Sequence, residues 1–168
     1  MSADQHRKCG KGIVARCAVI TLSDTRNPAT DASGSAIQQR LCESGHTIAE
    51  YRLIRDEPAE LRELLRQFLQ RQDIDAIITT GGTGLSRRDQ TVPVVEQLIE
   101  TPLPGFGELF RMLSFEQVGP AAMLSRAIGG VACGKLLFAL PGSPAACELA
   151  MSRLIGPELG HLLSHIRR

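Results

Sequence analysis

The sequence predicts an α/β fold with a mostly parallel sheet and helices on both of its faces. Three observations predict it: short apolar segments rich in β-branched residues, helical segments between them, and glycine or polar residues where each apolar segment ends. Strands and helices that alternate in this way form parallel sheets with right-handed crossovers. The chain has 168 residues, 43% of them hydrophobic, so it can bury one core. We expect one domain over residues 15–168, preceded by a flexible arm over residues 1–14.

The first expected strand covers residues 15–22, because the run A-R-C-A-V-I-T-L is short, apolar and partly β-branched. A helix should begin after Asp31, with Ile37 and Leu41 on one face, and end at Ser44-Gly45. Residues 47–54 form the second expected strand.

The second expected helix, residues 58–72, has the strongest helical pattern in the chain. Its apolar side chains recur at the spacing of one helix face: Leu61, Leu64, Leu65, Phe68 and Leu69. The third expected strand, residues 74–80, ends abruptly in the sequence G-G-T-G at residues 81–84.

The second half of the chain is expected to contain five helical stretches and two further strands. The helices are expected near residues 94–100, 108–116, 120–127, 145–155 and 157–166. The strands are expected at residues 128–131 and 135–140, with Cys133-Gly134 between them.

Polar or glycine residues follow four of the expected strands directly. They are Ser23-Asp24, Asp56-Glu57, Gly81 to Gly84, and Gly142-Ser143. Ligands of parallel α/β sheets bind just beyond the carboxyl ends of the strands, where such segments meet. The sequence therefore predicts one ligand site at this edge of the sheet.

The segment Thr79 to Asp89, T-T-G-G-T-G-L-S-R-R-D, is the strongest local signal for phosphate binding. Glycines allow left-handed backbone angles and let N–H groups approach an anion, and threonine hydroxyls add donors. The alternative interpretation is an ordinary turn between a strand and a helix. The segment is neither a Walker A motif nor the G-x-G-x-x-G fingerprint of dinucleotide sites.

Asp56 follows the second expected strand, and Asp89 lies at the end of the loop after the third. Paired acids beside phosphates usually hold Mg²⁺, which takes oxygen ligands and bridges phosphate oxygens. The alternative is helix capping by Asp89 and a solvated turn at Asp56, and spacing alone favours this alternative. For Asp24 the corresponding alternative is a turn formed with Ser23.

Charge and cysteine usage restrict the partners and the compartment. The formal net charge is +1, from 19 basic and 18 acidic residues, so no broad cationic face for nucleic acid is expected. No apolar run is long enough to cross a membrane. Five dispersed cysteines without a Cys-x-x-Cys pair favour reduced thiols and a cytoplasmic location.

Several short motifs, taken in their order and spacing, closely resemble the MoaB/Mog family of molybdenum-cofactor biosynthesis proteins. The motifs are I-T-L-S-D-T-R (20–26), R-D-E-P (55–58), T-T-G-G-T-G (79–84), R-D-Q-T (88–91), P-G-F-G-E-L-F-R-M-L-S (104–114), S-R-A (125–127) and L-P-G-S-P (140–144). The resemblance covers nearly the whole chain, and the family is related to the pterin-binding domain of gephyrin and its plant counterpart.

The resemblance implies a three-layer α/β/α domain with a mostly parallel sheet, assembled as a trimer or hexamer. It also implies adenylyl transfer, in which the terminal phosphate of molybdopterin attacks the α-phosphate of MgATP and pyrophosphate leaves. Molybdopterin and ATP would then be the substrates, Mg²⁺ the cofactor, and other molybdenum-cofactor enzymes candidate partners.

The matched motifs also assign residues to the expected site. Thr79, Gly81, Gly82, Thr83 and Gly84 would receive phosphate groups, and Asp56 and Asp89 would serve Mg²⁺ and catalysis. The remaining pocket would be lined by Ser23, Asp24, Glu108, Ser125, Gly142 and Ser143.

One departure from the family pattern bears on catalysis. Many active relatives continue V-T-P-E-A after the Arg-Asp pair, whereas this chain reads Q-T-V-P-V at residues 90–94, without the glutamate. The departure keeps two alternatives open: a non-catalytic protein that binds or delivers molybdopterin, and an oligomeric scaffold.

Overall fold

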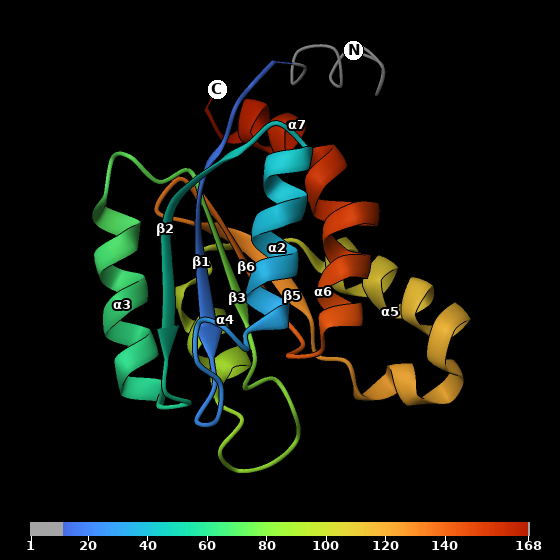
Figure 1. Ribbon diagram of the computed structural model, residues 1–168. Helices are drawn as coiled ribbons and strands as arrows, with labels where there is room; N and C mark the ends of the chain where they lie inside the picture. The colour runs from blue at the N-terminus through green and yellow to red at the C-terminus, as the bar shows by residue number, and fades with distance from the viewer. Residues whose placement is uncertain (1–11, 168) are drawn as a thin grey trace.

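A six-stranded sheet forms the centre of the computed structural model, which describes residues 12–167 (Figure 1). The strands are β1 (Arg16–Leu22), β2 (Thr47–Ile54), β3 (Ala76–Thr80), β4 (Thr101–Pro102), β5 (Ile128–Ala132) and β6 (Lys135–Leu140). Their order across the sheet is β2-β1-β3-β6-β5-β4. β2, β1, β3 and β6 are parallel, whereas β5 runs antiparallel to both β6 and β4. The predicted α/β fold with a mostly parallel sheet is confirmed.

Helices cover both faces of the sheet. They are α2 (Ala32–Glu43), α3 (Pro58–Gln70), α4 (Thr91–Leu98), α5 (Pro104–Val118), the 3₁₀ helix η1 (Gly119–Leu124), α6 (Pro144–Ala150), the π-helical turns η2 (Met151–Ile155) and α7 (Gly156–Ile166). One core lies beneath α2, α5, α6 and α7, and a second core lies beneath α3 and α4. No helix among the described residues is both long and apolar enough to cross a membrane.

Strand β1 shows why the sheet must be covered on both sides. Cys17 and Val19 point into the first core, and Ala18 and Ile20 point into the second, all four fully buried. A strand that buries both of its faces reads as a continuous apolar run, which is the pattern that predicted it.

The four parallel strands direct their carboxyl ends to the same edge of the sheet, at the bottom of Figure 1. The loops after β1, β2, β3 and β6 therefore meet there.

The expected helix at residues 58–72 ends at Gln70, and the expected strand at residues 74–80 is regular only from Ala76.

The second half of the chain departs from expectation in three places. The helix expected over residues 120–127 is the short 3₁₀ helix η1, which ends at Leu124. The helix expected near residues 94–100 begins already at Thr91, because Pro93 fits a first helical turn, where backbone N–H groups have no helical partners. Strand β4, two residues long, was too short to give a periodic signal.

The segment at residues 128–140 is a hairpin. Cys133 and Gly134 both have positive φ, 48° and 71°, and reverse the chain between β5 and β6. A tight turn of this kind pairs strands antiparallel, which explains why the sheet is only mostly parallel.

Residues 1–11 of the expected flexible arm lie outside the described part of the chain, and Ile13 packs against the first core.

We expect Ile78→Ala to lower the free energy of unfolding by about 2–5 kcal/mol, because Ile78 is fully buried in the central strand β3. Ile78→Val removes one methylene from the same place and should cost about 0.5–1.5 kcal/mol. Urea denaturation of the two variants measures the difference. Equal losses would mean that the side chain is not packed as the structure shows.

Candidate functional site at the carboxyl edge of the sheet

The turn after β3 has a left-handed backbone. Gly81 has φ of 100° and Gly82 has φ of 62°, a region that strongly favours glycine. A side chain at Gly81 would collide with the carbonyl oxygen of Leu22, and the Gly81 N–H donates to the Leu140 carbonyl at 3.2 Å. The turn is thus fixed between the ends of β1 and β6.

Both predicted aspartates lie against this turn. A Cβ atom built on Gly82 would lie 2.6 Å from Asp56 Oδ1, and one built on Gly84 would lie 2.8 Å from Asp89 Oδ2. The two carboxylates therefore face the Gly81–Gly84 turn, as a shared site requires.

Asp89 is held by its own loop. Its Oδ2 atom accepts a hydrogen bond from the Ser86 N–H at 2.9 Å, and hydrogen bonds from Ser86 and then Gly84 lower the pKa of Asp89. The helix-capping alternative for Asp89 is wrong, because the N-terminal cap of α4 is Gln90. The Asp89 carboxylate is thus ionised and directed across the loop.

Asp56 is in a different electrostatic environment. Within residues 12–167, no donor reaches its carboxylate, whereas its backbone N–H donates to Asp24 Oδ1 at 3.2 Å. Burial, followed by the negative charges of Asp89 and Asp24, raises the pKa of Asp56, and Arg88 partly offsets this. The Asp56 carboxylate thus lacks a counter-charge of its own in the described part of the chain.

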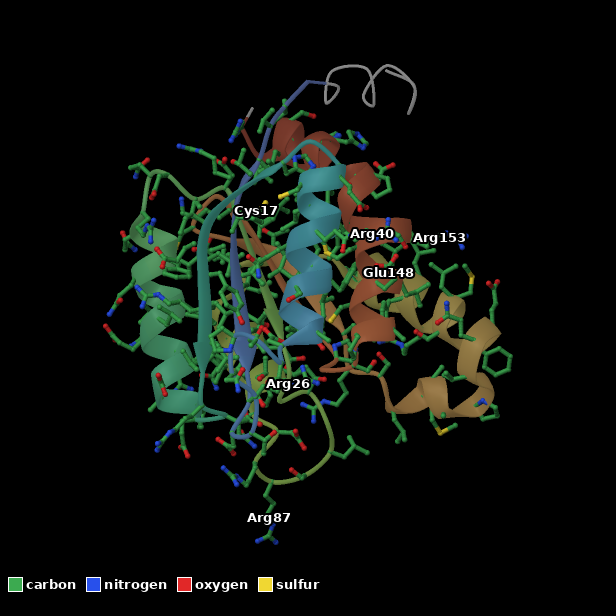
Figure 2. All side chains as sticks on the ribbon, in the orientation of Figure 1. Cys17, Arg26, Arg40, Arg87, Glu148 and Arg153 are labelled. Atoms are coloured by element: carbon green, nitrogen blue, oxygen red, sulfur yellow. The ribbon has the colours of Figure 1, made fainter. Side chains whose placement is uncertain are left out.

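Asp24 and Arg88 form an ion pair at the surface of the rim, with 2.7 Å between the guanidinium and Asp24 Oδ2. Exposed pairs of this kind contribute about 0–1 kcal/mol, so a ligand can displace this one at little cost. The neighbouring Arg87 extends away from the protein at the tip of the loop (Figure 2).

Four other predicted residues serve mainly to shape the site: Ser23, Thr79, Gly142 and Ser143. Ser23 accepts a hydrogen bond from the Arg26 N–H at 3.1 Å and so closes a turn. Thr79 is fully buried, and its hydroxyl donates to the Phe138 carbonyl, so this hydroxyl faces away from the rim.

Gly142 packs directly on Gly81, since a Cβ on Gly142 would lie 3.3 Å from the Gly81 Cα. Ser143 caps α6 by accepting from the Ala146 N–H at 3.2 Å. Thr83, the remaining residue of the turn, is 7% exposed.

The structure places Glu108 and Ser125 in two different cavities. The first, which we term the Glu108 cavity, has a volume of about 280 Å³ and lies between α4 and α5, where Glu96, Gly107, Glu108, Arg111 and Ala127 contribute to its walls. The second, the Ser125 cavity, has about 250 Å³ and includes Ser114, Gln117, Ser125, Pro141 and Ser143.

Arg126 connects both cavities to the glycine turn. It lies between Ser125 and Ala127, which line one cavity each, and its guanidinium donates to the Gly84 carbonyl at 2.9 Å. Sequence reasoning did not select Arg126 or Arg111 as site residues, although the matched motifs contain both.

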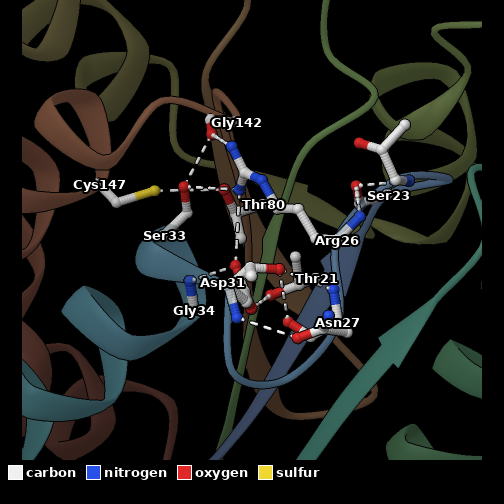
Figure 3. Close-up of polar contacts among 12 residues, drawn as sticks. Thr21, Ser23, Arg26, Asn27, Asp31, Ser33, Gly34, Thr80, Gly142 and Cys147 are labelled. Atoms are coloured by element: carbon white, nitrogen blue, oxygen red, sulfur yellow. Dashed lines mark hydrogen bonds and ion pairs between the residues drawn. The ribbon is translucent and has the colours of Figure 1, made fainter.

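A buried polar network fixes the loop after β1 to the loop after β6 (Figure 3). The Arg26 guanidinium donates to Ser33 Oγ at 2.9 Å and to the Gly142 carbonyl at 3.1 Å. It also pairs with Asp31, which is 1% exposed. Burial disfavours the ionised form of Asp31, but hydrogen bonds from Thr21, Gly34 and Tyr51, together with Arg26, lower its pKa.

No group of three or more histidine, cysteine, aspartate or glutamate side chains lies close enough to hold a metal ion among the residues that the structure describes. The rim offers two carboxylates instead, Asp56 and Asp89, each directed at the same glycine turn. Such a pair fits an ion that completes its coordination with water and ligand oxygens.

A mostly parallel α/β sheet with a left-handed glycine turn and acidic side chains beyond its strand ends defines a class of small-ligand proteins. A family model described as "Probable molybdopterin binding domain" matches residues 18–161. The chain belongs to the MoaB/Mog family of molybdenum-cofactor biosynthesis proteins, and the resemblance seen in its motifs is confirmed.

Individual relatives cover the whole chain. "Molybdenum cofactor biosynthesis protein B" of Halalkalibacterium halodurans is 48% identical over 99% of this chain and 98% of its own length. A crystal structure of a protein with the same name has a TM-score of 0.90 at 42% identity, over 93% of this chain and 98% of the other. A tungsten cofactor synthesizing protein from Pyrococcus furiosus has a TM-score of 0.84 at 33% identity, over 92% and 98%.

The Asp89→Asn substitution should lower the pKa of Asp56 in the ligand-free protein, because Asp89 has the largest effect of the three negative side chains that raise it, the others being Asp24 and Glu57. A pH titration of carboxyl ¹³C resonances measures this shift. Asp73→Asn is the matched control, since Asp73 is paired with Arg71 before β3, at the opposite edge of the sheet. An unchanged Asp56 titration in Asp89→Asn would show that the two carboxylates are too far apart to interact.

Proposed function

We propose that this protein adenylylates molybdopterin with MgATP and releases pyrophosphate. The observation that carries the proposal is the position of the Asp56 and Asp89 carboxylates on the left-handed turn at Gly81–Gly84. Membership of the molybdenum-cofactor biosynthesis family supports molybdopterin as the substrate. In the reaction, a terminal phosphate oxygen of molybdopterin attacks the α-phosphorus of ATP, and the bond from that phosphorus to the pyrophosphate oxygen breaks.

The chain's own residues supply much of what this transfer needs. Both substrates are polyanions, so their reacting oxygens must be aligned while their charge is screened. The Gly81 and Thr91 N–H groups already donate within the protein, to Leu140 and Gly82, so the Gly82 and Thr83 N–H groups of the glycine turn are the ones that suit phosphate oxygens. The Arg88 and Arg126 guanidiniums add positive charge at the rim.

Asp56 and Asp89 are the residues that would hold Mg²⁺. Mg²⁺ usually binds through one or two carboxylates and takes its remaining ligands from water and phosphate, so two carboxylates at one turn suit it without a larger cluster. The Asp56 carboxylate also favours a cation, since burial and neighbouring carboxylates raise its pKa and Arg88 offsets this only in part. When bound, the ion would screen the charge on the phosphate groups.

The Glu108 and Ser125 cavities offer space for the two substrates, and Arg126, which lies between residues of both, contacts the turn at Gly84. The Glu108 cavity and the Ser125 cavity each have walls of mixed polar and apolar side chains. Such walls suit flat heterocycles, which bury a ring while hydrogen bonding at its edge. We assign one ring system, pterin or adenine, to each cavity without ordering them.

We expect Asp56→Asn and Asp89→Asn each to lower the rate of adenylyl transfer by about 100-fold or more, because each removes charge directed at the proposed cation. Chromatography of molybdopterin, ATP and Mg²⁺ incubated with pure protein measures the product. Asp73→Asn, away from the rim, should retain the wild-type rate. If the folded wild-type protein forms no adenylylated product, the catalytic proposal is rejected.

A second candidate function is molybdopterin binding or delivery without catalysis. The observation that favours it is the first turn of α4, which contains no acidic residue. Many active relatives place a glutamate there, and this chain has Val94 in that segment. Molybdopterin binding without an ATP-dependent product in the assay above would select this alternative.

We further propose that the chain forms a homo-oligomer, a trimer or a hexamer. Large apolar side chains are exposed together on α5 and η1, a larger cluster than isolated surface hydrophobic residues. They are Leu109, Met112, Phe115, Val118, Met123 and Leu124. A free-standing scaffold would use the same surface, so oligomerisation by itself does not distinguish scaffold from enzyme.

Phe115→Glu should reduce the oligomer to smaller species, because a charge in an apolar interface is costly to bury. Light scattering coupled to size-exclusion chromatography measures the mass. Val14→Glu is the control, because Val14 is similarly exposed, 53% against 59% for Phe115, but lies outside the cluster. An unchanged mass for Phe115→Glu would place the interface elsewhere.

A further inference from the structure

Thr91 is the first residue of α4 and directly adjoins the glycine turn. Its backbone N–H donates to the Gly82 carbonyl at 3.0 Å, and its side chain is 1% exposed. The hydroxyl oxygen Oγ1 is fully buried, yet no hydrogen-bond partner reaches it within the described part of the chain. Buried hydroxyls are normally paired, so this one needs an explanation.

The Thr91 hydroxyl faces the same small space as the Asp56 carboxylate. A Cβ atom on Gly82 would collide with Asp56 Oδ1 and with Thr91 Oγ1, so both oxygens border the space that glycine leaves open. Both oxygens lie within 2.6 Å of that Cβ position, so they are close to each other. An unpaired donor and an unpaired acceptor thus lie side by side without a hydrogen bond between them in this structure.

Packing does not account for the hydroxyl. Valine has nearly the shape of threonine and would fill the same buried position without an unpaired polar atom. Capping does not account for it either, because Gln90 is the cap residue and Thr91 makes no side-chain hydrogen bond to the backbone.

We propose that Thr91 is a positioning residue for Asp56. When ligand binds, the Asp56 carboxyl group turns so that Thr91 Oγ1–H donates to Oδ1, and this bond holds Oδ2 toward the ligand's cation. The idea rests on the proposed function, because it takes a magnesium nucleotide as the ligand. It adds a residue that acts only through Asp56, and it explains why an unpaired hydroxyl persists in the ligand-free chain.

The test compares Thr91→Val and Thr91→Ser with the wild-type protein. Calorimetry measures the dissociation constant for ATP in the presence of Mg²⁺, and thermal unfolding measures Tm without ligand. We expect Thr91→Val to weaken binding by about tenfold or more, in line with the loss of a residue that orients a metal ligand. Its ligand-free Tm should be unchanged or higher, because the hydroxyl that it removes is unpaired.

Two further variants make the result specific. Thr91→Ser keeps the hydroxyl and should restore most of the affinity. Thr80→Val is the matched structural control, because the buried Thr80 hydroxyl already donates to the Pro141 carbonyl at 2.9 Å. Its removal should lower the ligand-free Tm, unlike the removal of the Thr91 hydroxyl.

The outcomes separate this inference from the proposed function. If Thr91→Val binds MgATP as tightly as wild type, or loses ligand-free stability as Thr80→Val does, the positioning role is overturned and the proposed function stands. If wild type binds MgATP no better than Asp56→Asn, the proposed function and this inference both fall.

Discussion

The close approach of three strand ends at Gly81 is the constraint on which the site depends. The left-handed turn there passes the carbonyl of Leu22 on one side and the backbone of Gly142 on the other, with no room for a Cβ atom. Only because this turn leaves β3 so sharply can the loop fold back and present Gly82 to Asp56 and Gly84 to Asp89. A bulkier turn would separate the acidic residues from the backbone groups beside them.

The two aspartates face one turn, yet their surroundings differ. Asp89 is stabilised as an anion by Ser86 and Gly84 in its own loop, whereas Asp56 is partly buried near two other carboxylates and has no donor in the described chain. Paired groups whose surroundings shift their pKa values in opposite directions are typical of functional sites. The asymmetry makes Asp56 the more responsive of the two to a bound cation.

The polar network around Arg26 and Asp31 gives this rim its rigidity. It joins the end of β1, the start of α2 and the loop after β6 through buried and partly buried charge-assisted hydrogen bonds. Such networks are costly when incomplete and rigid when satisfied. The acidic pair and the turn therefore belong to a scaffold that is largely formed before any ligand arrives, with the Asp24–Arg88 pair as a replaceable contact at its surface.

Sequence analysis predicted the alternation of strands and helices, the parallel part of the sheet and the acidic and glycine residues at the strand ends, because burial periodicity and turn chemistry are local properties. It missed β4 and the antiparallel direction of β5, and it placed Glu108 and Ser125 in one pocket. These features, and the unpaired Thr91 hydroxyl beside Asp56, became visible only in the packed three-dimensional structure. Which side chains meet depends on how segments distant in sequence pack together, and no local pattern encodes that.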